Sequence, residues 1–273
     1  MSVKIEASGR RSVQVEVEVP GTPEQVWQAI ATGPGISSWF APAAFEERDG
    51  KPVALIMTVG PMETRSAVTA WDAPRKFTSE ADGWFPGSPR VATEWSVEAR
   101  SGGVCVVRVV QSLFASTDDW DDQLIGTEAG IPGAFRILRI YLTHFRGQRS
   151  AFMQFMAPVA GSPADAWAML TSTLGLDGLS DGQGWAAPAG VPALSGVVEH
   201  VNQSSPGALL RLDQPGPGIA ALFTMDLGES VMAVFSCYLY GDQAAGTVAR
   251  ETPLWQAWIQ ERFPMPAELS TSE

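Results

Sequence analysis

A short phrase of glycine, a hydroxyl residue and proline occurs once in each half of the chain. The copies read Gly-Thr-Pro-Glu-Gln-Val-Trp at 21–27 and Gly-Ser-Pro-Ala-Asp-Ala-Trp at 161–167. An echo of the form Trp-x-Ala-Pro follows each copy, beginning at Trp39 and at Trp185. A chain of 273 residues is large enough for two ordinary domains. The repeat therefore predicts two copies of one structural unit, at residues 1–150 and 151–273.

Each copy of the phrase has the residues of a helix start. Thr22 and Ser162 are hydroxyl N-caps, and the proline after each stands where a missing N–H does no harm. Gln25 and Asp165 lie three residues after the cap, as a capping box requires. Apolar residues at helical spacing follow in both copies, so each predicts a strand, a tight turn and a capped amphipathic helix.

Short strands separated by turn residues fill the first half, and the second half repeats the layout in shortened form. Valines at 13, 15, 17 and 19 alternate with polar residues, which predicts a half-buried strand. Further strands are expected at 52–59, 64–71, 76–81, 90–99 and 104–114, with a closing helix at 132–146. In the second half we expect a strand at 152–157, a helix at 163–174, strands at 196–201, 208–212, 220–225 and 231–240, and a helix at 253–263. Residues 175–190 form a loop insertion, and the almost wholly apolar 231–240 predicts a strand buried on both faces. The fold class is α+β, with a curved antiparallel sheet and a terminal helix across it.

Composition excludes several classes of partner. The net charge of −12 argues against nucleic acid and anionic lipid, which need basic patches. No apolar run has the length of a membrane span, and the N-terminus lacks the apolar segment of a signal peptide. Cys105 and Cys237 are expected to be reduced core residues, which favours the cytoplasm. The second half holds only 3 basic and 12 acidic residues, so we expect it to contact the first half or another chain, as a homodimer or with a protein partner.

Several motifs of catalytic or metal sites fail on their context. The G-x-S-x-G pattern at 178–182 lies in the insertion with no helix pattern after it, and the G-x-G-x-x-A pattern at 216–221 lies between strands. His144 and His200 have no ligand or nucleophile at a telling spacing, so structural roles are expected, and no zinc site can be assembled. Four aspartates at 118–122 allow either a hard-cation site or, as we favour, a helix N-terminal region. No cofactor, metal or catalytic residue is therefore assigned.

The residues at 17–27, the Trp-Phe-Ala-Pro at 39–42 and the Asp-Trp-Asp-Asp-Gln at 119–123 resemble the START-like (SRPBCC) superfamily. Within it, the chain is most similar to the branch named for the activator of the heat-shock-protein ATPase. The resemblance covers residues 10–149 and is fainter over 151–265. It implies a helix-grip fold, in which a bent antiparallel sheet wraps a long C-terminal helix around a cavity. Members bind lipids, sterols, polyketides or plant hormones, some are cyclases, and eukaryotic relatives of the branch are co-chaperones.

The resemblance and the aromatic content together predict a small hydrophobic ligand in the cavity of the first unit, with the second unit a degenerate copy. Pockets for such ligands are mostly apolar with a few polar anchors. A co-chaperone-like interaction module and a cyclase or aromatase-type enzyme are the alternatives. The same side chains could instead simply fill the core. The expected lining residues are Trp39, Phe40, Met57, Phe77, Trp84, Trp95, Phe114, Phe135 and Leu138.

Overall fold

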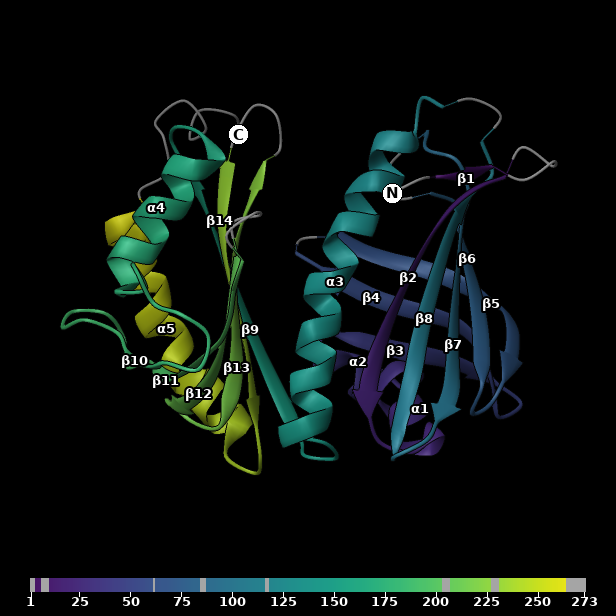
Figure 1. The fold of residues 1–273 in the computed structure, drawn as a ribbon, viewed down its shortest axis with the longest axis horizontal. Helices are drawn as coiled ribbons and strands as arrows, with labels where there is room; N and C mark the ends of the chain where they lie inside the picture. The colour runs from purple at the N-terminus through teal and green to yellow at the C-terminus, as the bar shows by residue number, and fades with distance from the viewer. Residues whose placement is uncertain are drawn as a thin grey trace. The chain divides into compact units, whose positions relative to one another are not determined.

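The chain forms two compact units, Met1–Arg146 and Gly147–Glu273, in a computed structural model (Figure 1). The structure describes residues 3–5, 10–60, 62–83, 87–115, 118–202, 207–226 and 231–263. Each unit contains one antiparallel sheet and a long helix that follows its last strand. None of the helices within these ranges is long and apolar enough to cross a membrane.

The first unit is an eight-stranded sheet with three helices in its described part. The strands follow the order β1-β2-β8-β7-β6-β5-β4-β3, so all neighbours except β2 and β8 are consecutive along the chain. Figure 1 shows the long α3 on one side of this curved sheet, running in the same direction as β2. The elements are β1 (Lys4–Ile5), β2 (Arg11–Pro20), α1 (Pro23–Ile30), α2 (Gly33–Ser37), β3 (Ala43–Arg48), β4 (Lys51–Val59), β5 (Met62–Asp72), β6 (Lys76–Ala81), β7 (Val91–Arg100), β8 (Val104–Leu113) and α3 (Asp121–His144).

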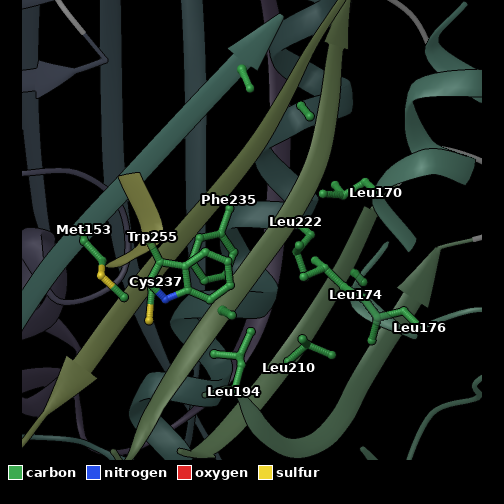
Figure 2. Close-up of a cluster of buried hydrophobic side chains, with 14 of the residues drawn as sticks. Met153, Leu170, Leu174, Leu176, Leu194, Leu210, Leu222, Phe235, Cys237 and Trp255 are labelled. Atoms are coloured by element: carbon green, nitrogen blue, oxygen red, sulfur yellow. The ribbon is translucent and has the colours of Figure 1, made fainter. Parts of the chain in front are cut away.

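The second unit has a six-stranded sheet in the order β10-β11-β12-β13-β14-β9, with two helices on one face (Figure 1). Its core is continuous, and Figure 2 shows Trp255 stacked on Phe235, with leucines of α4 and of the strands around them. The elements are β9 (Ser150–Val159), α4 (Pro163–Leu174), β10 (Gly184–Ala186), β11 (Ser195–Asn202), β12 (Gly207–Gln214), β13 (Gly218–Asp226), β14 (Val231–Tyr240) and α5 (Ala244–Arg262). The α+β class and the tandem helix-grip layout, shortened in the second unit, are confirmed.

The repeated phrase has the same local structure in both units. Thr22 and Ser162 each accept a hydrogen bond from the backbone N–H three residues on, at 3.4 and 3.2 Å. Gln25 and Asp165 complete the capping boxes by accepting from the N-cap N–H, both at 3.0 Å. The preceding glycine has a positive φ in both copies, +131° and +99°, and residues with a side chain rarely adopt such values. The phrase is therefore a strand-to-helix turn that demands glycine.

The Trp-x-Ala-Pro echo is also one structural device used twice. Trp39 donates its indole N–H to the carbonyl of Ala29 in α1, and Trp185 donates to the carbonyl of Leu174, the last residue of α4. Both distances are 2.9 Å, and both tryptophans are buried. A helix leaves its last carbonyls without helical partners, so these bonds satisfy groups near each helix end. The echo anchors the segment after the helix and carries no chemistry of its own.

The capping boxes allow a direct test. Thr22→Ala and Ser162→Ala should each lower the free energy of unfolding of their own unit by about 1 kcal/mol, because a helix N–H loses its acceptor. Hydrogen exchange resolved by peptide reports each unit separately. Ser172→Ala, on the exposed side of α4, is the matched control and should change the stability of the second unit by less than about 0.5 kcal/mol. Equal effects of Ser162→Ala and Ser172→Ala would contradict the capping role.

Most expected elements are confirmed, but both closing helices begin earlier than expected. Helix α3 starts at Asp121 and not at residue 132, and α5 starts at Ala244 and not at residue 253. Pro132 and Pro253 lie inside these helices, where proline removes one hydrogen bond and usually marks a boundary. Packing of the inward face on the sheet stabilises the helix on both sides of each proline.

Three shorter segments also differ from expectation. The Gly-Pro-Gly segment after α1 forms the five-residue helix α2, and residues 43–48 form the strand β3. The insertion at 175–190 contains the three-residue strand β10, and its Leu176 and Trp185 are buried in the core. Strand β14, in contrast, is buried along both faces as expected. Cys105 and Cys237 are free and buried, and burial raises the pKa of both thiols.

Candidate ligand-binding site

Aromatic side chains on the inner face of the first sheet form one connected cluster. Strand pairing places Val109, Trp95, Phe77 and Trp71 in one row, because directly opposed residues share a face. The Trp95 ring stacks on Phe77 with centroids 6.3 Å apart and meets Phe135 of α3 edge-on at 6.0 Å. The cluster thus joins the sheet to the long helix.

The structure brings most of the expected lining residues to this cluster. Trp39 meets Trp95 edge-on at 6.1 Å, and Phe40, partly exposed, lies against Trp39. Leu138 is fully buried on the same stripe of α3 as Phe135. Met57 lies on β4 opposite Thr64 and is half-buried.

Two of the expected residues do not join the cluster within the described structure. Phe114 follows β8, is 44% exposed, and lies under the guanidinium groups of Arg10 and Arg90 at 5.4 and 5.2 Å. Trp84 lies outside the described residues.

Three rings that were not expected there complete the cluster. Trp27 of α1 meets Trp71 at 5.2 Å and Phe77 at 5.8 Å, both edge-on, and Phe45 meets Trp71 at 5.5 Å. The sequence placed Trp27 on an amphipathic helix but did not indicate that its ring would contact the sheet. Phe45 lies in β3, a strand that was not predicted. Trp71 ends an expected strand, so strand alternation could have found it.

A row of polar side chains lies next to the aromatic row on the same face of the sheet. Direct pairs join Val13 to Gln111, Gln111 to Thr93 and Thr93 to Ser79. Ser79 is 4% exposed, and the Oε1 atom of Gln111 is buried without a hydrogen-bond partner. An apolar cluster of Val13, Val91, Leu113 and Leu124 begins at the Val13 end of this row and extends beyond it. The polar row is therefore enclosed between two apolar regions.

The inward stripe of α3 carries a carboxylate. Leu124, Glu128 and Phe135 lie within about 40° of one another around the helix, at 100° per residue. Leu124 packs in the apolar cluster and Phe135 touches Trp95, so this stripe faces the sheet. Glu128 is 8% exposed as a residue, and neither of its carboxylate oxygens is among the buried atoms without a hydrogen-bond partner in the described structure. Glu128 was not predicted on this stripe because the helix was expected to start at residue 132.

The position of Glu128 along the sheet follows from the ends of α3. Asp121 in the first turn pairs with Arg11 at the start of β2, and Arg146 just after the helix lies beside Gly21 after β2. At about 1.5 Å per helical residue, Glu128 lies about 10 Å beyond Asp121. At about 3.3 Å per strand residue, Val13 and Val15 lie about 7 and 13 Å beyond Arg11. Val13 begins the polar row and Val15, which pairs with Val109, begins the aromatic row. Glu128 therefore lies between these two rows.

The Arg11–Asp121 ion pair fixes the start of α3. Both guanidinium nitrogens Nε and Nη2 donate to the two carboxylate oxygens, and both side chains are largely buried. These hydrogen bonds hold the pKa of Asp121 below its ordinary value of 3.8. The interpretation of residues 118–122 as a helix N-terminal region is confirmed for Asp121 and Asp122, which lie in the first turn. A group of three or more acidic, histidine or cysteine residues suited to a metal ion is not found in the described part of the chain.

The ion pair predicts a pH-dependent stability. Because the folded pKa of Asp121 is lowered, its contribution is fully present above about pH 4 and is lost as the pH falls through the folded value. Asp121→Asn should therefore lower the melting temperature at pH 6 and lose this effect toward pH 2. Thermal unfolding between pH 2 and 7 measures the difference, with Asp122→Asn in the same turn as control. A difference independent of pH would contradict the assignment.

The second unit offers a different interior. Its sheet face toward the helices is apolar, as in the row Val198, Leu210, Ala220, Cys237 and Met153. A cavity of about 20 Å³ lies between α4, α5 and the sheet, lined by Phe155, Leu170, Phe235, Trp255, Trp258 and neighbouring residues. This volume suits about one water molecule and not an organic ligand.

The second closing helix also carries a buried glutamate. Glu251 is 6% exposed and accepts a hydrogen bond from Nε of Arg250 at 3.0 Å. Glu128 and Glu251 are the only charged residues that are buried within the described ranges.

The remaining motifs have structural roles. Residues 178–182 form turns without a following helix, and residues 215–217 form the turn of the β12–β13 hairpin, both as expected. His144 lies in the last turn of α3. His200 pairs with Asp181 at 3.2 Å, and the other oxygen of Asp181 accepts from the N–H of Val201 at 2.9 Å. The Asp181 carboxylate thus ties the insertion to β11.

Comparison with known families identifies the first unit. Residues 10–135 match the model of the family described as polyketide cyclase / dehydrase and lipid transport, which is of the START-like type. The first unit is a START-like domain. The resemblance found in the sequence is thereby confirmed, and the sheet with its gripped α3 is the fold of this superfamily.

Solved structures similar to the chain include both single and tandem proteins. The di-domain ARO/CYC BexL from the BE-7585A biosynthetic pathway has a TM-score of 0.43 at 11% identity, over 94% of this chain and 99% of that chain. Protein MLL2253 from Mesorhizobium loti has a TM-score of 0.43 at 20% identity, over 50% and 98%. The Aha1 dimer from Colwellia psychrerythraea has a TM-score of 0.39 at 15% identity, over 50% and 98%. No curated protein sequence matches the chain.

Proposed function

We propose that the START-like domain of the first unit binds a small hydrophobic molecule between its sheet and α3. The observation that carries the proposal is the contrast between the two interiors. The first combines aromatic rings with a polar row that contains the buried Ser79 and the buried Oε1 atom of Gln111, whereas the sheet face of the second is apolar around a cavity of about 20 Å³. Ligand pockets join an apolar lining to a few polar groups, and the first interior has both.

The family description supports the same class of ligand. It names polyketide cyclases, dehydrases and lipid transport, and each of these needs a site that accepts an apolar molecule. The second unit keeps the fold with fewer strands and fills its interior with side chains. We therefore assign ligand binding to residues near Trp95 and Phe135, and structure or association to the second unit.

Binding of 2-naphthol, a rigid aromatic with one hydroxyl, tests the proposal. Isothermal titration calorimetry of the full chain should show one site, weakened about tenfold or more by Trp95→Leu, which removes a ring from the cluster. Trp258→Leu, which removes a ring lining the second unit's cavity, is the matched control and should leave the affinity unchanged. Absence of binding, or an affinity that falls with Trp258→Leu and not with Trp95→Leu, would contradict the proposal.

A further inference from the structure

The two described sheets have four edge strands, and three of these have features that discourage pairing with another chain. β1 and β10 are only two and three residues long. β3 carries Glu46, Glu47 and Arg48, and its pairing with β4 shifts register between the two glutamates. β9, in contrast, is ten residues long, contains no charged residue and pairs with β14 without a register shift. A long, regular and uncharged edge is a template for another strand.

Alternate residues of β9 direct their backbone groups to this edge. The N–H of Gly241 donates to the carbonyl of Arg149 at 2.9 Å, and these two residues extend the β9–β14 pairing by one step. Every second pair of an antiparallel ladder is hydrogen-bonded, so the odd-numbered residues of β9 bond to β14. The even-numbered residues, from Ser150 to Pro158, therefore present their backbone groups to the edge. Pro158 fits this assignment, because strands tolerate proline where the missing N–H would face outward.

The corresponding strand of the first unit shows what β9 lacks. β2 and β9 both precede the repeated glycine-hydroxyl-proline phrase, so residues 140 positions apart are equivalent. β1 pairs only with the first two residues of β2, so the rest of β2 is also an edge in the described sheet. That edge carries the exposed Glu16 and Glu18, whose equivalents in β9 are Met156 and Pro158. The first unit thus has carboxylates where the second has uncharged residues.

A second copy of β9 is the partner that this edge fits. Two identical strands that pair antiparallel are related by a two-fold axis, so each supplies the same surface to the other. Because β9 has no charged residue, no like charges meet across the axis. The start of one strand lies beside the end of the other. Arg149, exposed just before β9, is thereby brought toward Asp165, exposed in the first turn of α4 just after β9. Opposite charges therefore meet at both ends of the paired strands.

From this arrangement we propose that two copies of the chain associate by antiparallel pairing of their β9 edges, which joins their six-stranded sheets into one continuous sheet. The pairing gives partners to the outward backbone groups of Phe152, Gln154 and Met156 in both copies. The proposal goes beyond ligand binding by the first unit and does not depend on it. It names the surface through which the second unit associates.

Light scattering coupled to size-exclusion chromatography, over a concentration series of the full chain, measures the association. The wild type should form a dimer with a Kd on the order of 10 μM or tighter. Met156→Glu and Met156→Lys place a charge of either sign on the edge and should each raise the Kd about tenfold or more. Met169→Glu and Met169→Lys introduce the same charges on the exposed side of α4 and are the matched controls. They should change the Kd by less than about twofold.

A wild type that remains monomeric at about 100 μM would overturn the proposal, and so would a dimer that survives both Met156 substitutions with the same Kd. Amide-resolved hydrogen exchange of the wild type gives a second readout that needs no variant. The N–H groups of Phe152, Gln154 and Met156 should become protected as the concentration rises through the Kd, whereas the odd-numbered N–H groups of β9 should be protected at every concentration. A dimer that forms without new protection of these three N–H groups would show that another surface is used.

Discussion

Trp39→Ala is expected to lower the free energy of unfolding of the first unit by about 3–5 kcal/mol. The side chain is 1% exposed, touches the rings of Phe40 and Trp95, and donates its indole N–H to the carbonyl of Ala29. Truncation leaves a cavity beside Trp95 in the aromatic cluster and also removes the donor. Hydrogen exchange resolved by peptide, with urea as perturbant, measures the loss in the first unit.

The same position separates packing from hydrogen bonding. Trp39→Phe keeps most of the buried area but leaves the Ala29 carbonyl without its indole donor, so a loss of about 1–3 kcal/mol is expected. Trp185→Phe is the matched variant in the second unit, because Trp185 makes the same bond to Leu174 at the same distance. Similar losses of unfolding free energy in the two units would show that the indole hydrogen bond has the same role in both. No loss in either would mean that the bond adds nothing to stability.

Gly35→Ala is expected to destabilise the first unit by about 3 kcal/mol or more, the upper range for overpacking. A Cβ on Gly35 would lie 1.9 Å from the backbone oxygen of Gln28 and 2.9 Å from Cα of Ala29. These are backbone atoms of α1, so no side chain can rotate away, and α2 must move off α1. Denaturant unfolding of the purified variant measures the effect, and a poor yield of folded protein agrees with it.

The control for this prediction is another glycine in a helix. Gly126 lies on the exposed side of α3, and nothing approaches within 4 Å of an added Cβ there. Gly126→Ala should stabilise the first unit by about 0.5–1 kcal/mol, because alanine has the higher helix propensity. If Gly35→Ala behaves like Gly126→Ala, the close packing of α2 on α1 is wrong.

Local signals were enough to predict most of this architecture. The capping boxes, the valine alternation of β2 and the apolar run of β14 depend on neighbouring residues, and each appears as expected. The helix ends at Pro132 and Pro253 were misjudged because packing on a sheet, which joins residues far apart in sequence, outweighed the local cost of proline. β3 was missed for a related reason, since Phe45 owes its place to strand pairing and to the rings of Trp71 and Phe77.

The sequence predicted the aromatic residues of the candidate site but not its polar residues. Aromatic residues on alternating strands could be assigned to the interior, and Trp39, Phe77, Trp95 and Phe135 are found in one cluster. The acceptors were not found, because Gln111 and Glu128 are ordinary surface residues by type. Only the register of β8 and the length of α3 place them inside.

We propose that a small hydrophobic molecule binds inside the first unit. Hydrogen exchange of the full chain with and without 2-naphthol tests it most directly, since it reports where protection changes. Added protection is expected in peptides of β7, β8 and α3, and none in peptides of β14 and α5. Protection confined to β14 and α5, or no change anywhere in the presence of saturating 2-naphthol, would contradict it.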